Sequence, residues 1–299
     1  MTKEQALPQS TNHIMMMEPL NFYANEQTMA TNSYQHDNDN DKSVIQKKAQ
    51  EEFKAFRDLL VEHGVILTTT LGQEGCPDDI FCNNWVSTHS GGRMVLYPML
   101  ASNRQTERRK ELIDRLRQCY SDVQDFTLHE QHGKALESTG AMCMDRVNKI
   151  AYQARSDRSN EELGAMWCKM NDYTHIPFDT EHMGKPVYHA DVVMWIGSEL
   201  AGICSECLVN DDIVKNLKKH REVIEFTNEQ MKNFCGNSLE VIGTGGERML
   251  VMSAAGYNIL RDDQKEMLSR FYKTIITPEI PTIEYYGGGS ARCMLLELF

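Results

Sequence analysis

The segment Gly287-Gly288-Gly289-Ser290-Ala291-Arg292-Cys293-Met294 places a cysteine directly after a glycine-rich turn near the end of the chain. Glycine reaches backbone conformations that other residues avoid, so a thiol beside such a turn is typical of a presented nucleophile. Two distant segments contain what a thiol nucleophile lacks. His189 can move protons near neutral pH, and Glu137 has a carboxylate that can orient the imidazole or help charge it. Cys293, His189 and Glu137 are therefore the candidate catalytic residues, although each residue type taken alone is more often structural.

Short sequence motifs elsewhere in the chain accompany the three candidate catalytic residues. They occur at residues 25–35, 77–85, 108–111, 136–140, 156–159, 189–191 and 288–293. In that order they resemble the guanidine-modifying, or pentein, superfamily of arginine deiminases, dimethylarginine hydrolases and amidinotransferases. The sequences of these motifs are most similar to those of the citrulline ureidase branch, whose Asn-Asn-Trp and Gly-Gly-Gly-Ser-Ala-Arg-Cys motifs occur here unchanged. The resemblance implies an α/β fold, a five-bladed pseudo-symmetric propeller.

The alternation of short apolar runs with amphipathic stretches also indicates an α/β fold. Strands are predicted at residues 13–17, 65–69, 94–97, 190–196, 200–204, 249–252 and 294–298. Helices are predicted at residues 44–63, 105–118, 160–170, 210–220, 228–234 and 264–272. A doubly wound sheet would explain this rhythm nearly as well, so the choice of five blades depends on the resemblance.

Bulk properties restrict the class of protein. The chain has 299 residues, and its 31 Lys+Arg against 43 Asp+Glu give a net charge of -12, which argues against non-specific nucleic-acid binding. Its 9 scattered cysteines are typical of a reducing cytoplasm. No apolar run is long enough to span a membrane. We expect residues 1–12 to form a flexible tail and residues 13–299 a single catalytic domain, with the oligomeric state left open and a homo-oligomer compatible with the sequence.

Three other motifs have structural interpretations. Cys204 and Cys207 form a C-x-x-C pair without a second pair at zinc-binding spacing, so they are interpreted as structural free cysteines. Residues 36–41 alternate Asp and Asn but lack the Gly and Glu of a calcium loop, which favours a solvent loop. Residues 243–246 lie between two apolar runs and are predicted to form a hairpin turn rather than a phosphate loop. No metal or organic cofactor is expected.

The resemblance also implies residues that bind the substrate. Arg158 and an arginine of the 108–111 phrase would hold the α-carboxylate of a free amino acid, because a planar guanidinium pairs with both carboxylate oxygens. Arg109 is the candidate in that phrase, and the sequence does not reveal whether Arg108 faces the site instead. Asn84 stands where deiminases have an acidic residue, and its amide can donate to the C=O of a ureido group. Asp191 would accept from the NH2 end, and Asn83 would assist.

These roles define one main function and several alternatives. Cys293 would attack the ureido carbon of citrulline, and His189 would protonate the departing amine and then activate water. Glu137 would bind the planar group, orient His189, or do both. The products would be ornithine, carbon dioxide and ammonia, released through a covalent adduct. An arginine deiminase, a dimethylarginine hydrolase, an amidinotransferase and a non-enzymatic binding propeller are the alternatives.

Overall fold

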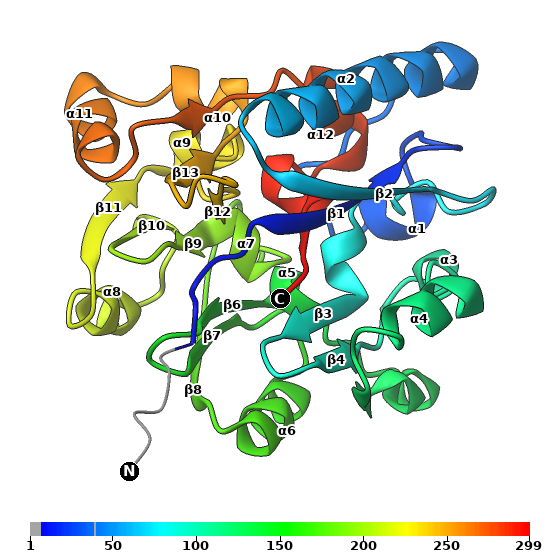
Figure 1. Cartoon of the computed structure of the whole chain (residues 1–299), viewed down its shortest axis with the longest axis horizontal. Helices are drawn as coiled ribbons and strands as arrows, with labels where there is room; N and C mark the ends of the chain where they lie inside the picture. Colours follow the sequence, from blue (N-terminus) through cyan, green and yellow to red (C-terminus); the bar gives the residue numbers. More distant parts are fainter. Residues whose placement is uncertain (1–6, 39) are drawn as a thin grey trace.

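The computed structural model describes residues 7–38 and 40–299. Within them the strands form five three-stranded sheets, arranged as blades around a central axis (Figure 1). In each sheet an inner strand pairs antiparallel with the middle strand, which pairs parallel with the outer strand. The repetition of this mixed pattern confirms the predicted five-bladed α/β propeller.

The first blade joins the two ends of the chain. Its middle strand β1 (His13–Glu18) lies between the outer strand β2 (Ile66–Leu71) and the inner strand β15 (Leu296–Glu297). The other blades follow in sequence order, each written from inner to outer strand. They are β3 (Val86–His89), β4 (Arg93–Leu96) and β5 (Asp122–Asp125); β6 (Met142–Asp145), β7 (Ile150–Ala154) and β8 (Thr174–Phe178); β9 (Met194–Ile196), β10 (Leu200–Cys204) and β11 (Glu222–Phe226); and β12 (Leu239–Ile242), β13 (Arg248–Val251) and β14 (Ile275–Ile276).

Helices connect the middle strand of each blade to its parallel outer strand, because a parallel pair needs a long crossover. These helices are α2 (Lys42–Glu62), α3 (Ser102–Gln105), α4 (Lys110–Leu116), α6 (Glu161–Asn171), α8 (Asp212–Leu217), α10 (Ala254–Asn258) and α11 (Asp262–Phe271). A further helix, α9 (Asn228–Lys232), follows the outer strand β11. The remaining elements are α1 (Glu26–Met29), η2 (Thr127–His132) and α12 (Pro281–Gly287) outside the inner ring. The crossover helices lie towards the periphery, which leaves the axis to the inner strands (Figure 1).

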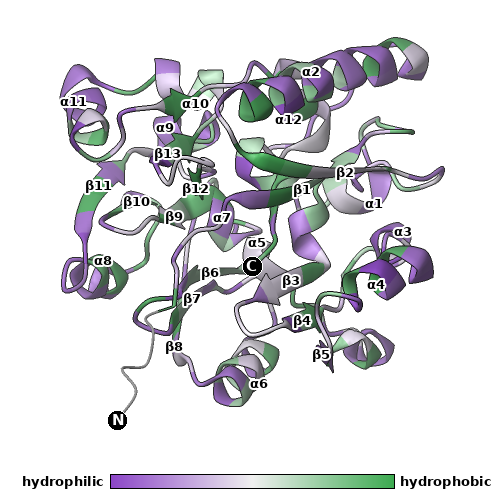
Figure 2. Ribbon diagram, viewed as in Figure 1, coloured by the Kyte–Doolittle hydropathy of each residue, from purple (hydrophilic) through white to green (hydrophobic). Residues whose placement is uncertain are grey.

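The longest helix shows how the sequence produces this layout. The buried side chains of α2 recur at helical spacing and form one stripe: Ile45, Ala49, Phe53, Phe56 and Leu60. The other faces of α2 and much of α11 are hydrophilic, as expected for solvent-facing helix surfaces (Figure 2). Fully burying each large side chain of the stripe contributes roughly 1.5–3 kcal/mol, so this face holds α2 against the first blade.

Several predicted elements have different boundaries in the structure. The run at residues 190–196 is split into the short helix α7 (Ala190–Val193) and β9. The predicted helix at residues 105–118 is replaced by α3 and α4, and the predicted strand at 294–298 is reduced to β15 after the helix η3 (Ala291–Met294). Apolar runs cannot distinguish a buried helical turn from a buried strand, which explains the first and last differences.

The smaller motifs can also be placed. β12 and β13 pair antiparallel across residues 243–247, which confirms the predicted hairpin. Cys204 and Cys207 are buried free cysteines. Residues 36–38, 40 and 41 are exposed and precede α2, in agreement with a solvent loop. In the described part of the chain, no helix is both long and apolar enough to cross a bilayer.

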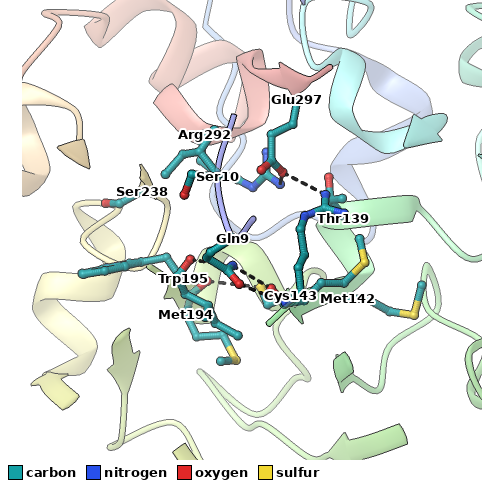
Figure 3. A pocket seen from close by; sticks show the side chains of 14 residues that line it. Gln9, Ser10, Thr139, Met142, Cys143, Met194, Trp195, Ser238, Arg292 and Glu297 are labelled. Atoms are coloured by element: carbon teal, nitrogen blue, oxygen red, sulfur yellow. Dashed lines mark hydrogen bonds and ion pairs between the residues drawn. The ribbon is translucent and has the colours of Figure 1, made fainter. Parts of the chain in front are cut away.

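The N-terminal segment differs from the flexible tail that we expected. Residues 1–6 lie outside the described residues, but residues 9–12 are tied into the propeller. Gln9 is buried, and its side-chain amide donates to the carbonyls of Met144 and Ile196 at 2.9 and 3.2 Å (Figure 3). Ser10 donates to Glu240 at 2.6 Å. The polar residues of this segment suggested a solvated tail. In the structure, Gln9 and Ser10 instead form hydrogen bonds with residues of three blades.

Candidate active site

The candidate site forms where the entries to the inner strands meet on the propeller axis. Four of these entries are short helices: η1 (Cys82–Asn84), α5 (Ser138–Ala141), α7 and η3. The fifth is a turn at residues 234–238. Helix α5 contacts both η1 and α7, and η1 contacts η3, so the segments form one cluster near the centre of Figure 1. Residues far apart in sequence are brought together by this convergence.

Cys293 lies in η3 and is buried, with 3% of its surface exposed. Its Sγ accepts a hydrogen bond from the side-chain amide of Asn237 at 3.1 Å and lies 3.6 Å from Asp191 Oδ2. Burial raises the pKa of the thiol, and the negative charge of Asp191 raises it further. Both effects favour the protonated thiol at neutral pH.

The glycine turn before Cys293 has a specific geometric requirement. Gly288 ends α12 in the left-handed region at φ 61, and a Cβ there would lie 2.6 Å from the backbone nitrogen of Gln35. Only glycine accepts both that conformation and that approach at low cost. The turn thereby directs the chain from α12 into the site.

His189 and Glu137 are both almost fully buried and are hydrogen-bonded to each other. His189 Nε2 lies 2.8 Å from Glu137 Oε2, and His189 Nδ1 lies 3.9 Å from Asp191 Oδ1. Burial acts to raise the pKa of Glu137, but Arg158, His189 and Arg104 outweigh it and lower the pKa to about 2. With its pKa lowered, Glu137 is ionised at neutral pH and accepts a hydrogen bond from Nε2–H, which leaves Nδ1 as the nitrogen that can exchange a proton within the site.

Asn84 ends η1, and its amide has a defined orientation. Its Oδ1 accepts from Arg104 Nη1 at 2.9 Å, whereas Asn84 Nδ2 has no hydrogen-bond partner within the described residues. Because the carbonyl end is already engaged, Asn84 presents a donor to the cavity. Gly140 packs against this group, since a Cβ there would lie 2.5 Å from Asn84 Nδ2 and 2.7 Å from His189 Nδ1. The amide of Asn84 and the imidazole of His189 are therefore neighbours.

Asp191 and Asn83 are paired in the same cluster. Asn83 Nδ2 donates to Asp191 Oδ2 at 3.1 Å and to Thr139 Oγ1 at 3.2 Å. Asp191 Oδ1 is buried and has no hydrogen-bond partner within the described residues. Arg292 Nε lies 3.8 Å from Asp191 Oδ2, while the far end of Arg292 reaches Glu297 in a second cavity (Figure 3). Asp191 thus has one carboxylate oxygen without a hydrogen-bond partner, although Asp191 does not itself line the cavity beside Cys293.

The predicted arginines occupy different places. Arg158 is buried beside Tyr188, and its guanidinium donates to Thr28 O at 2.9 Å and to Thr31 Oγ1 at 2.8 and 3.0 Å. Arg158 also lines the cavity of Cys293. Arg109 does not line it, because its guanidinium contacts the Leu71 carbonyl at 2.5 Å and Glu111 at 3.6 Å.

Arg108 also points elsewhere, towards Glu130 at 2.7 Å. Arg104 lines the cavity instead, is 2% exposed, and lies 3.8 Å from Glu137 Oε2. Its guanidinium is paired with Glu107 at 2.8 Å. Sequence reasoning missed Arg104 because the predicted helix at residues 105–118 excluded it. It also missed Asn237, whose only sequence signal is its place before an inner strand.

The cavity around Cys293 is nearly closed. It is lined by Asn32, Asp78, Phe81, Asn84, Arg104, Arg158, Tyr188, His189, Gly287, Gly289 and Cys293. Its free volume is about 10 Å³, which is roughly enough for one water molecule. The side chain of Asn32 donates to Gly288 O at 3.1 Å and helps to close it. An amino acid is much larger than this volume, so residues that line the cavity must move before one can bind.

Comparisons with known proteins indicate the family and the fold of this chain. The family described as N,N dimethylarginine dimethylhydrolase, eukaryotic, matches residues 18–299. The N-terminal domain of ArgZ bound to substrate, an arginine dihydrolase from the ornithine–ammonia cycle in cyanobacteria, superposes with a TM-score of 0.76 at 16% identity, covering 95% of this chain and 97% of that chain. A dimethylarginine dimethylaminohydrolase adduct with 4-chloro-2-hydroxymethylpyridine has a TM-score of 0.67 at 18% identity, with 96% and 99% covered.

A longer protein, AgrE in a binary complex with L-arginine, has a TM-score of 0.77 at 16% identity, and 96% of this chain covers 40% of it. At these identities the structural likenesses support the fold. No curated protein sequence matched this chain significantly.

Proposed function

Because the chain belongs to the family of eukaryotic N,N-dimethylarginine dimethylhydrolases, hydrolases that act on C–N bonds, we propose that it hydrolyses the guanidino group of a free arginine-type amino acid. The observation that carries the proposal is the buried pair formed by the Cys293 thiol and the Asp191 carboxylate, 3.6 Å apart. This proposal replaces citrulline as the first choice of substrate, which the sequence alone had favoured.

The charge of the substrate is the reason to prefer a guanidino group, which is a cation, to the neutral ureido group of citrulline. Burial and Asp191 both raise the pKa of Cys293, so the thiol needs a nearby positive charge to ionise at neutral pH. A guanidinium bound next to Cys293 supplies that charge, and its N–H groups are suitable donors for Asp191 Oδ1, which has no hydrogen-bond partner within the described residues. A neutral ureido group supplies no charge. A cationic substrate therefore lowers the pKa of the Cys293 thiol when it binds, and a neutral substrate does not.

The reaction then proceeds in two steps, the formation of a covalent adduct with Cys293 and its hydrolysis. Cys293 Sγ forms a bond to the guanidino carbon as the thiol proton passes to the departing nitrogen through His189, and the C–N bond breaks to release an amine. Water next adds to the thiouronium carbon while His189 takes its proton, and the C–S bond breaks to regenerate the thiol. Glu137 keeps His189 oriented throughout by accepting its Nε2 proton. The products are citrulline and ammonia from arginine, or citrulline and a methylated amine from a methylarginine.

Arg158 is the candidate for the α-carboxylate end of the substrate. It lines the cavity, and its guanidinium donates to Thr28 O and Thr31 Oγ1. A planar guanidinium at that position can pair with both carboxylate oxygens of a free amino acid. This arrangement favours a free amino acid over an internal peptide residue.

Citrulline remains a second candidate because of one observation, the unpartnered donor of Asn84. Arg104 donates to the oxygen of that amide, so the group that Asn84 leaves without a partner is a donor, which suits a ureido C=O better than a guanidinium. With citrulline the same residues would release ornithine, carbon dioxide and ammonia.

A product assay tests the proposal. The protein and its Cys293→Ala variant are incubated separately with arginine, dimethylarginines and citrulline, and the amino-acid products are identified by mass spectrometry. We expect citrulline from a guanidino substrate with the parent protein only. Consumption of citrulline alone would favour the second candidate, and turnover that requires an added amine acceptor would indicate an amidinotransferase. No turnover of any of these compounds would contradict both.

A further inference from the structure

The repeated architecture of the five blades points to one more residue in the candidate active site. Four of the five entries to the inner strands carry residues already assigned to the site, among them Asn84, Glu137, His189 and Cys293. The fifth entry, the turn at residues 234–238 before β12, contains Asn237. We propose that Asn237 is a further catalytic residue that positions Cys293 and stabilises its thiolate by a hydrogen bond to Sγ. The inference rests on the proposed function, because it concerns the same nucleophile.

The hydrogen bonds of Asn237 determine which way its amide faces. Oδ1 accepts from the backbone N–H groups of Arg292 at 3.1 Å and Cys293 at 3.3 Å. Because an N–H group can only donate, the oxygen must face the backbone N–H groups of η3, which fixes the NH2 group at the other end of the amide. Nδ2 donates to the carbonyl of Asp191 at 2.8 Å and to Cys293 Sγ at 3.1 Å. All four hydrogen-bonding positions of the amide are used, and one of them reaches the sulfur.

The turn is held rigidly against the neighbouring blade. Asn237 is 0% exposed, and its backbone N–H donates to the carbonyl of Phe234 at 2.9 Å. Phe234 has φ 62, a left-handed conformation that is uncommon for a non-glycine residue. A Cβ on Gly236 would lie 2.1 Å from the carbonyl oxygen of Val192 in α7, so glycine is required for this approach. The donor is therefore fixed before any substrate binds.

Asn237 joins the two segments whose spacing matters most for attack. One segment carries Asp191, which would hold the substrate, and the other carries Cys293, which would attack it. A thiolate is a much better hydrogen-bond acceptor than a thiol, so a fixed donor favours the ionised form. Asp191 acts in the opposite direction, and the amide of Asn237 partly offsets its negative charge.

The test measures the ionisation of Cys293 directly. The rate of alkylation by iodoacetamide is followed from pH 5 to 11, and the peptide containing Cys293 is quantified by mass spectrometry so that other cysteines do not contribute. Asn237→Ala removes the donor, and Asn237→Asp replaces it with an acceptor of the same size. Asn258→Asp makes the same chemical change at an exposed position of α10 and serves as the matched control.

We expect the apparent thiol pKa to rise by about 1–2 units in Asn237→Ala, the scale of one hydrogen bond to a charged group. The rise should be larger in Asn237→Asp and absent in the control, with kcat/KM at pH 7 falling at least tenfold in both Asn237 variants. An unchanged thiol pKa in folded variants would overturn the inference, whether or not the melting temperature falls, because a structural role alone would lower only stability.

If neither variant folds, Asn237→Ser is measured in the same way, and an unchanged pKa there has the same meaning. Failure of the inference and failure of the proposed function give different results. A parent protein whose Cys293 is neither alkylated nor able to support turnover would overturn both, whereas a reactive, catalytically competent Cys293 with an unchanged pKa in the variants would overturn only the role of Asn237.

Discussion

Replacing Asn84 by aspartate would change the hydrogen bonding of the cavity without changing its size. In the parent protein, Arg104 Nη1 holds one end of the Asn84 side chain at 2.9 Å, and the unpartnered Nδ2 is the other end. Arg104 would pair even more strongly with a carboxylate oxygen, so the side chain should keep its orientation. The second carboxylate oxygen would then occupy the place of the donor.

The expected magnitude follows from that exchange. A ureido oxygen facing a carboxylate loses a hydrogen bond in a closed cavity, which costs about 1–3 kcal/mol, or roughly 5–150-fold in kcat/KM. A guanidinium facing the same carboxylate gains a charge-assisted hydrogen bond of similar scale in a site that excludes water. We therefore expect the ratio of kcat/KM for citrulline to that for arginine to fall by at least tenfold in Asn84→Asp.

The assay compares both substrates in the parent, in Asn84→Asp and in Asn210→Asp, a matched substitution at an exposed position. Melting temperatures establish that the variants are folded. A ratio that stays constant, or that moves towards citrulline, would show that Asn84 does not contact the planar group of the substrate. The reasoning from the orientation of the Asn84 amide would then be refuted.

Three other outcomes are expected from the same geometry. Cys293→Ala should abolish turnover while Cys119→Ala, at an exposed cysteine, leaves it unchanged, and substantial activity in a folded Cys293→Ala protein would remove the nucleophile. Glu137→Gln should lower kcat by about a hundredfold or more, because His189 loses its charged partner. The pKa of Glu137 falls from its ordinary 4.5 to about 2 on folding. Its contribution to stability is therefore present above about pH 4.5 and is lost as the pH falls towards 2. In acid titrations followed by circular dichroism, Glu137→Gln should lose less stability over that range than the parent protein. Arg158→Ala should raise KM for a free amino acid by about 10–100-fold, the scale of a lost charge-assisted contact, and kinetics equal to the parent would place the carboxylate elsewhere.

Local patterns predicted the elements that are long or strongly patterned. The helical repeat of apolar residues indicated α2, and two apolar runs flanking a glycine-rich turn indicated the β12–β13 hairpin. Short strands such as β5 and β8 were not predicted, because four or five residues with little alternation give no periodic signal. Five blades could not be derived from periodicity either, since the blades share a topology and not a sequence repeat.

The sequence by itself determined which chemical groups we propose for the site, because the motifs around Cys293, His189 and Glu137 predicted a thiol, an imidazole and a carboxylate as a set. Only the tertiary structure decided which neighbours act on them. Arg104 and Asn237 come from segments that no local pattern connects to the site, and their side chains reach Asn84 and Cys293 because the entries to the inner strands meet on one axis. Local sequence specifies which groups are available, whereas the closure of the propeller, through β15 pairing with β1, decides the distances and charges between them.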